Sequence, residues 1–236
     1  MIQGRIDIHS HLLPNLDDGC QSVDDALACA RRLVGAGYTH SFCTPHVWTN
    51  LPNNNVAKIP LAVRNLQLAL DAAAIPLTLL PGGENNFTEL RGPWEADLVT
   101  VNLANRYVLA DIWVDALPDY FFEQVKRLQD RGLTVILAHP ERMRAVQDKP
   151  GLADDFNKLG LLLQGNLQCL GDPLHTHTRR TAERFLLEGR YTFLASDLHN
   201  SKSLGIRLQG LKNAIELAGD AVVDRLTIEN PQMLMK

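Results

Sequence analysis

The sequence has no long hydrophobic run and no excess of positive charge. Its 236 residues contain no stretch of about 18 consecutive apolar residues, so we expect no membrane-spanning helix. The 27 acidic residues outnumber the 23 basic ones, giving a net charge of −4 and no basic patch for binding nucleic acid. The first residues lack the charged-then-apolar pattern of a signal peptide, so a cytoplasmic location is expected.

Cysteine is scarce, and its spacing excludes several classes of enzyme. None of the four cysteines forms a C-x-x-C pair, so buried, reduced thiols are expected rather than a zinc ribbon or a redox pair. No cysteine is followed six positions later by the arginine that a cysteine-dependent phosphatase needs. The motifs G-x-S-x-G and G-x-x-x-x-G-K-[ST] are also missing. We therefore expect a metal-bound hydroxide, not a side chain, as the nucleophile of any hydrolase built on this chain.

A strand-then-helix rhythm recurs along the whole chain. Strands rich in Val, Ile and Leu are predicted at 5–11, 38–44, 77–83, 106–113, 133–139, 161–166 and 191–196. Helices are predicted at about 22–34, 56–73, 118–131, 152–159, 178–188 and 206–218. This alternation is typical of parallel β/α units, and seven units favour a TIM-like barrel over an open sheet. We predict an α/β fold with one domain spanning residues 1–236, and an irregular loop at 48–58.

Side chains that can bind metal recur where these strands end. In a β/α barrel the carboxyl ends of all strands share one face, so such residues converge there. The candidates are His9, His11, Asp18, His46, Glu84, His139, Asp197 and His199. Each motif is weak alone, because paired surface histidines are common. His175 and His177 share the H-x-H spacing but precede a helix, so we expect them to be solvated.

The number of candidate ligands predicts more than one metal ion. Five imidazoles and three carboxylates are too many for one ion, so two or three divalent ions with a bridging carboxylate are expected. Nitrogen and oxygen donors without thiolate favour manganese, iron or zinc. Neighbouring ions about 3.5–4 Å apart are typical of phosphate-ester hydrolysis.

Four further residues have expected roles around this site. Arg142 and Arg207 are candidate catalytic residues, because a guanidinium can grip phosphate oxygens in pairs; solvated helix arginines are the alternative. Asp7 lies at the same alternation of the strand as His9 and His11, so it should point to the same side. We expect it to orient one imidazole by a hydrogen bond without binding metal itself. Asp17 is expected to be an ordinary loop residue.

Five ordered segments resemble a known family. IDIHSHLLPNLDDG, TPH, GGE, HPER and SDLHN resemble the polymerase and histidinol phosphatase (PHP) family, and more narrowly its bacterial tyrosine phosphatases of capsule and exopolysaccharide clusters. The resemblance implies a distorted (β/α)7 barrel and three metal ions, usually manganese or iron, held by the eight candidates above. It implies that Arg142 and Arg207 bind phosphate. The implied substrate is phosphotyrosine in the tail of a membrane-associated tyrosine kinase that controls polysaccharide export.

Departures from the family pattern concern substrate choice, and three other functions stay open. Asn85 and Asn86 replace a commonly apolar and basic pair, Asp111 stands where glutamate is frequent, and the loop 48–58 is rich in asparagine. The chain could be a small-molecule phosphoesterase of the same fold, such as a histidinol-phosphate phosphatase. It could be an amidohydrolase, although residues 106–113 contain no bridging lysine. A non-catalytic, metal-stabilised domain is disfavoured because the ligand set is complete.

Overall fold

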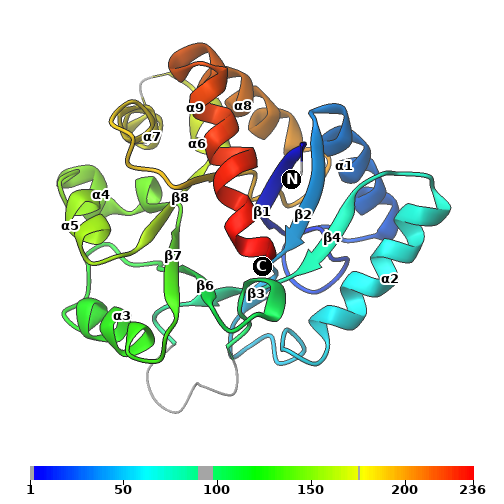
Figure 1. The fold of residues 1–236 in the computed structure, drawn as a ribbon, viewed down its shortest axis with the longest axis horizontal. Coiled ribbons are helices and arrows are strands. Elements are labelled where there is room, and N and C mark those ends of the chain that lie inside the picture. Colours follow the sequence, from blue (N-terminus) through cyan, green and yellow to red (C-terminus); the bar gives the residue numbers. More distant parts are fainter. Residues whose placement is uncertain (1–2, 90–97, 175) are drawn as a thin grey trace.

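A closed ring of parallel strands organises the chain (Figure 1). The computed structural model describes residues 3–89, 98–174 and 176–236. The strands are β1 (Arg5–Ser10), β2 (Tyr38–Cys43), β3 (His46–Val47), β4 (Thr78–Pro81), β5 (Glu84–Asn86), β6 (Tyr107–Asp111), β7 (Thr134–Ala138), β8 (Leu162–Asn166) and β9 (Phe193–Ala195). They pair in the orders β1-β2-β4 and β3-β5-β6-β7-β8-β9, and every pairing is parallel.

Two short interruptions split what would otherwise be seven strands. Two residues separate β2 from β3, and Gly82 and Gly83 separate β4 from β5, so each pair fills one position around the ring. A Cβ atom at Gly83 would lie 2.6 Å from Val47, so the chain passes here at a distance that only glycine allows. A parallel bridge between Ser10 and Leu198 joins the two ends of the ring. The predicted distorted barrel is therefore confirmed.

Helices cover the outside of the ring, as predicted (Figure 1). They are α1 (Val23–Gly35), α2 (Ile59–Ala72), α3 (Phe121–Gln129), α4 (Arg144–Asp148), α5 (Leu152–Lys158), α6 (Leu167–Gly171), α7 (His177–Leu187), α8 (Leu204–Ala218) and α9 (Asp220–Asp224). Ser22 begins α1 by accepting a hydrogen bond from the backbone N–H of Asp25 at 3.1 Å. The five-residue helices α4, α6 and α9 escaped prediction because they are too short to show a helical period. Within the described ranges, no helix has the length and hydropathy to cross a membrane.

Two apolar cores fill the spaces outside and inside the ring. Along β6, Val108 and Ala110 belong to the outer core beneath the helices, whereas Leu109 belongs to an inner cluster with Phe42 and Phe193. The chain beyond α9 continues in two short helical turns, Arg225–Glu229 and Asn230–Met235. The second turn closes this inner cluster with Leu234, which is 1% exposed.

The C-terminal turns close the amino end of the barrel. Tyr107 and Leu162, the first residues of β6 and β8, pack against the inner cluster together with Met233 and Met235. In Figure 1 the red C-terminal segment accordingly crosses the ring of strands. The carboxyl ends of the strands are thus left to form the functional face.

The burial of Leu234 at the amino end of the barrel generates a prediction about stability. Leu234→Ala should lower the free energy of unfolding by about 2–5 kcal/mol, because it leaves a cavity in the inner cluster. Leu61→Ala is the matched control: Leu61 is 59% exposed on α2, so about 0.5 kcal/mol or less is expected. Urea denaturation measures both changes. Equal losses in the two variants would show that Leu234 does not close the core.

Candidate metal centre

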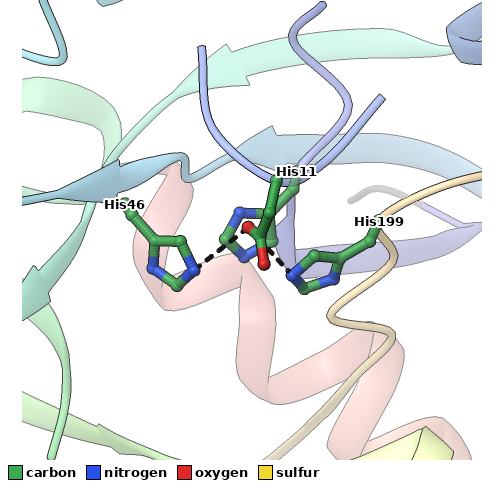
Figure 2. A group of neighbouring side chains, drawn as sticks. His11, His46 and His199 are labelled. Carbon is green, nitrogen blue, oxygen red and sulfur yellow. Dashed lines mark ion pairs between the residues drawn. The ribbon is translucent and has the colours of Figure 1, made fainter. Parts of the chain in front are cut away.

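The eight predicted ligands lie together at the carboxyl ends of the strands. His9 lies near the end of β1, His46 begins β3 and Glu84 begins β5, while His139 and Asp197 follow β7 and β9. The side chains are largely buried, except that of Asp18, which is 68% exposed. Figure 2 shows His11, His46 and His199 converging from separate segments of the chain. The predicted convergence of these residues is therefore observed.

One group of donor atoms has the spacing expected around a single ion. His9 Nε2 and His11 Nε2 lie 3.3 Å apart, and Asp197 Oδ1 lies 3.5 and 3.3 Å from them, respectively. Donors bound to one ion at about 2.1 Å in tetrahedral or octahedral geometry are separated by about 3.0–3.4 Å. These three side chains could therefore hold an ion with little movement.

The Glu84 carboxylate lies among four imidazoles. Its Oε1 atom is 3.4 Å from His9 Nε2 and 3.0 Å from His139 Nε2. Its Oε2 atom is 3.4 Å from His11 Nε2 and 2.8 Å from His46 Nδ1. Because the two oxygens face different histidine pairs, this carboxylate has the geometry of a bridge between two ions.

A second group surrounds the exposed Asp18 side chain. Its Oδ1 atom is 3.4 Å from both His46 Nε2 and His199 Nε2, the ion pairs drawn in Figure 2. Together with His11 these residues form a separate set of potential metal ligands. His46 directs Nε2 at Asp18 and Nδ1 at Glu84, so a neutral His46 ring can serve an ion on only one of the two sides.

Residues outside the cluster fix the orientation of two of the imidazoles. Gln164 Oε1 lies 2.9 Å from His9 Nδ1, and Asp17 Oδ2 lies 2.7 Å from His11 Nδ1. Asp17 also accepts hydrogen bonds from the backbone N–H groups of Gly19 and His46 at 2.9 Å. With Nδ1 donating to these oxygens, Nε2 of each ring keeps a lone pair directed at the cluster.

This arrangement corrects the expected roles of Asp17 and Asp7. Asp17 is not an ordinary loop residue, since the loop folds back and presents its carboxylate to His11. Asp7 does not orient an imidazole. It accepts hydrogen bonds from the backbone and hydroxyl of Ser196 and from the backbone N–H of His9, and thereby ties β1 to β9. The parity argument failed because the register of β1 against β2 shifts between Asp7 and Ser10.

Three of the buried polar atoms that make no regular hydrogen bond within the described structure lie together. They are His46 Nδ1 and Glu84 Oε2, which face each other as an ion pair at 2.8 Å, and Asp111 Oδ1. The same three residues form a further set of potential metal ligands. An unpaired buried polar atom is costly, so this coincidence fits a site whose remaining partner is a cation. Asp111 was not predicted as a ligand; its position at the carboxyl end of a strand could have identified it.

The pKa values of the clustered side chains also favour a site that binds cations. Burial disfavours ionised Glu84, yet the surrounding histidines hold the pKa of this carboxyl well below its usual range. Burial disfavours a charge on His46, but the carboxylates of Asp18 and Glu84 beside its two nitrogens raise its pKa to about 10. At Asp111, burial and the Glu84 charge raise the pKa well above the ordinary value. Without a cation beside it, Asp111 is thus driven toward its neutral form.

Two of the candidate ligands occupy a strained backbone conformation. His139 has φ 35° and Asp197 has φ 49°, a region that residues with a side chain rarely adopt. His139 directly follows β7, and Asp197 lies two residues after the end of β9. A sharp turn at each place directs the side chain across the mouth of the barrel. Strain of this kind concentrates at functional sites.

The two arginines differ in their surroundings. Both line a cavity of about 400 Å³ above the cluster. Arg142 Nη1 lies 3.4 Å from Asp197 Oδ2, and its side chain is 35% exposed. Arg207 is buried and donates to the backbone oxygens of Ser196, Asp197 and Ser203 at 2.9, 2.9 and 3.0 Å. Arg142 is the freer of the two to bind a ligand.

Asn85, the loop 48–58 and the second H-x-H motif complete the comparison with the sequence-based expectations. Asn85 is buried and bonds to the backbone of Gly83, Val99 and Leu109, so it does not face the cavity. Residues 48–58 are irregular, as expected. His177 is exposed at the start of α7, whereas His175 lies outside the described residues.

Comparison with known proteins gives consistent matches over the whole chain. A family model described as capsular polysaccharide synthesis, CpsB/CapC, matches residues 5–236. The tyrosine-protein phosphatase YwqE of Bacillus subtilis is 30% identical, with 98% of this chain and 91% of that protein covered. The tyrosine-protein phosphatase CpsB of Streptococcus agalactiae is 24% identical over 98% of both chains.

A solved structure matches the fold closely. It belongs to a study of YwqE from Bacillus subtilis and CpsB from Streptococcus pneumoniae, described as metal-dependent tyrosine phosphatases. The TM-score is 0.88 with 27% identity, covering 98% of this chain and 94% of that chain.

The contact between Asp17 and His11 generates a prediction about metal affinity. Asp17→Asn should weaken manganese binding about 10- to 100-fold, because a neutral amide loses the charge that strengthens the hydrogen bond to the His11 ring. Competition with a chelator measures the affinity. Asp130→Asn, an exposed carboxylate at the end of α3, is the matched control and should bind as the parent does. Equal affinities for the parent and Asp17→Asn would contradict the orienting role.

The raised pKa of His46 generates a prediction about pH. At pH 7 the metal-free His46 ring holds a proton, because its pKa is about 10, and that proton must leave before the ring binds an ion. Manganese binding should therefore release protons and tighten as pH rises from about 6 to 8. Calorimetry in buffers of different ionisation enthalpy counts the protons. A binding enthalpy independent of the buffer would contradict this protonation state.

Proposed function

The chain belongs to the CpsB/CapC family of capsular polysaccharide synthesis and is a metal-dependent tyrosine phosphatase, and from this premise we propose its ligands and substrate. The eight clustered residues hold two or three divalent ions, with manganese preferred over iron and zinc. The substrate is phosphotyrosine in the tail of a membrane tyrosine kinase that controls capsule or exopolysaccharide synthesis. The reaction takes place in the cytoplasm.

The Glu84 carboxylate is the observation that carries this proposal. It is 1% exposed and has two imidazoles beside each oxygen, which suits a bridge between ions. Divalent ions bound there would activate water and compensate the charge of the phosphoryl group. The donors are imidazole nitrogens and carboxylate oxygens without thiolate, which supports manganese or iron over a soft metal.

The protein's own residues account for phosphate binding. Arg142 can turn its guanidinium from Asp197 to the phosphate oxygens, because its side chain is partly exposed at the cavity. Arg207 keeps the backbone of Ser196 and Asp197 in place through Nε and adds positive charge to the same cavity. Asp17 and Gln164 hold the rings of His11 and His9 in their working orientation.

The shape of the mouth favours a peptide over a small phosphoester. Two cavities adjoin the one above the metal cluster: one of about 440 Å³ shares Asp18, His46 and Trp48 with it. The other, of about 390 Å³, shares Trp113, His139 and Arg142. A chain that extends on both sides of the phosphorylated residue could use these spaces, whereas a small substrate would leave them empty.

The activity assay compares two substrates with and without chelator. Turnover of a phosphotyrosine peptide should exceed that of histidinol phosphate and should vanish after chelation. Arg142→Ala should lower kcat/KM about 10²- to 10³-fold, as expected for the loss of a charge-stabilising donor. Arg184→Ala is the matched control and should keep the parent's kcat/KM, since Arg184 is 51% exposed on α7, pairs with Glu188 and lies outside these three cavities. Activity that survives chelation, or a preference for histidinol phosphate, would overturn the proposal.

A further inference from the structure

Two tryptophans line the cavity above the metal cluster. Trp48 directly follows β3 and Trp113 lies two residues beyond β6. In the sheet, β5 is placed between β3 and β6, so these indoles come from either side of the strand that carries Glu84. The remaining tryptophan, Trp94, lies outside the described residues.

Trp113 is held on one edge and one face, while much of its surface stays open. Its Nε1–H donates to Asp111 Oδ2, and the Arg142 guanidinium carbon lies 4.7 Å from the centre of its ring. The residue is nevertheless 54% exposed. A large, fixed and half-exposed aromatic side chain at a cavity is typical of a surface that contacts a ligand.

Trp48 is fixed in a similar way. Its ring stacks on that of His46, with the ring centres 4.1 Å apart and the planes at 27°. Its buried Nε1 atom has no hydrogen-bond partner among the residues that the structure describes. The stacking on His46 therefore fixes the position of the indole, which forms the wall of the cavity on the His46 side.

We propose that Trp113 and Trp48 are specificity-determining residues that select a flat aromatic leaving group. This inference rests on the proposed function, and it adds how the ring next to the phosphate is recognised. A phosphate on Arg142 would place the attached ring beside Trp113, since the guanidinium and the indole already stack. Offset or edge-to-face contact between the substrate ring and the indoles then favours aryl over alkyl phosphates.

A purely structural role for the tryptophans predicts a different result. Trp113 touches Arg142 and Asp111, and Trp48 touches His46, so their replacement could disturb phosphate or metal binding in general. Such a disturbance would weaken all phosphate-like ligands alike. Loss of an aromatic contact would weaken only ligands that carry a ring. The comparison of two phosphonates that cannot be hydrolysed separates these cases.

The experiment measures binding of phenylphosphonate and methylphosphonate to the manganese-loaded chain by calorimetry. The parent should prefer phenylphosphonate. Trp113→Leu and Trp48→Leu should each weaken phenylphosphonate roughly tenfold, while methylphosphonate changes by less than about twofold. Trp113→Phe should restore most of the preference. Phe122→Leu, which removes an aromatic ring that is 42% exposed on α3, is the matched control and should leave both affinities unchanged.

Two outcomes would overturn this inference. One is an equal loss of both phosphonates in the leucine variants, and the other is an unchanged preference for phenylphosphonate. Hydrolysis of phosphotyrosine peptide by the parent is scored separately. Absence of that hydrolysis would refute the proposed function, whereas hydrolysis with an unchanged ring preference would refute only the role of the tryptophans.

Discussion

Burial of the Glu84 carboxylate is the constraint on which the rest of the site depends. A buried carboxylate costs several kcal/mol unless positive charge and hydrogen bonds compensate it. Here four imidazoles surround it, and Asp197 and Asp111 add further buried acid groups nearby. Protonated histidines satisfy this charge only in part: Asp111 Oδ2 accepts a hydrogen bond from Trp113, but Asp111 Oδ1 has no hydrogen-bond partner in the described structure. Divalent cations are the compensation that the donor set fits best.

The barrel makes this concentration of charge possible. Parallel strands bring residues that are far apart in sequence to one face, and left-handed backbone at His139 and Asp197 turns their side chains across it. The opposite end is closed by the apolar C-terminal turn around Leu234, which is buried in the inner cluster. Asp17 and Gln164 then hold two rings from outside the cluster. The apolar amino end of the barrel thus contributes stability, and the charged carboxyl end forms the functional site.

Sequence reasoning succeeded where the argument depended on strand ends, and it failed where a role depended on how a loop folds back or on the register between strands. The rhythm of strands and helices predicted the barrel, and the positions of the histidines predicted their convergence. The role of Asp17 could not be predicted, because it depends on a loop that folds back onto His11. Strand parity misassigned Asp7, because β1 shifts register within the ring. The C-terminal turns are too short and irregular to show a period. Asn85 supports the backbone through hydrogen bonds to the neighbouring Gly83 and to two distant segments, at Val99 and Leu109.

The central claim is that Glu84 joins at least two ions in one site. Anomalous diffraction from crystals grown with manganese tests it most directly, since each ion gives its own peak. The account predicts two or three peaks per chain, with separate ions beside Oε1 and Oε2 of Glu84. A single peak, or peaks that avoid Glu84 altogether, would contradict it.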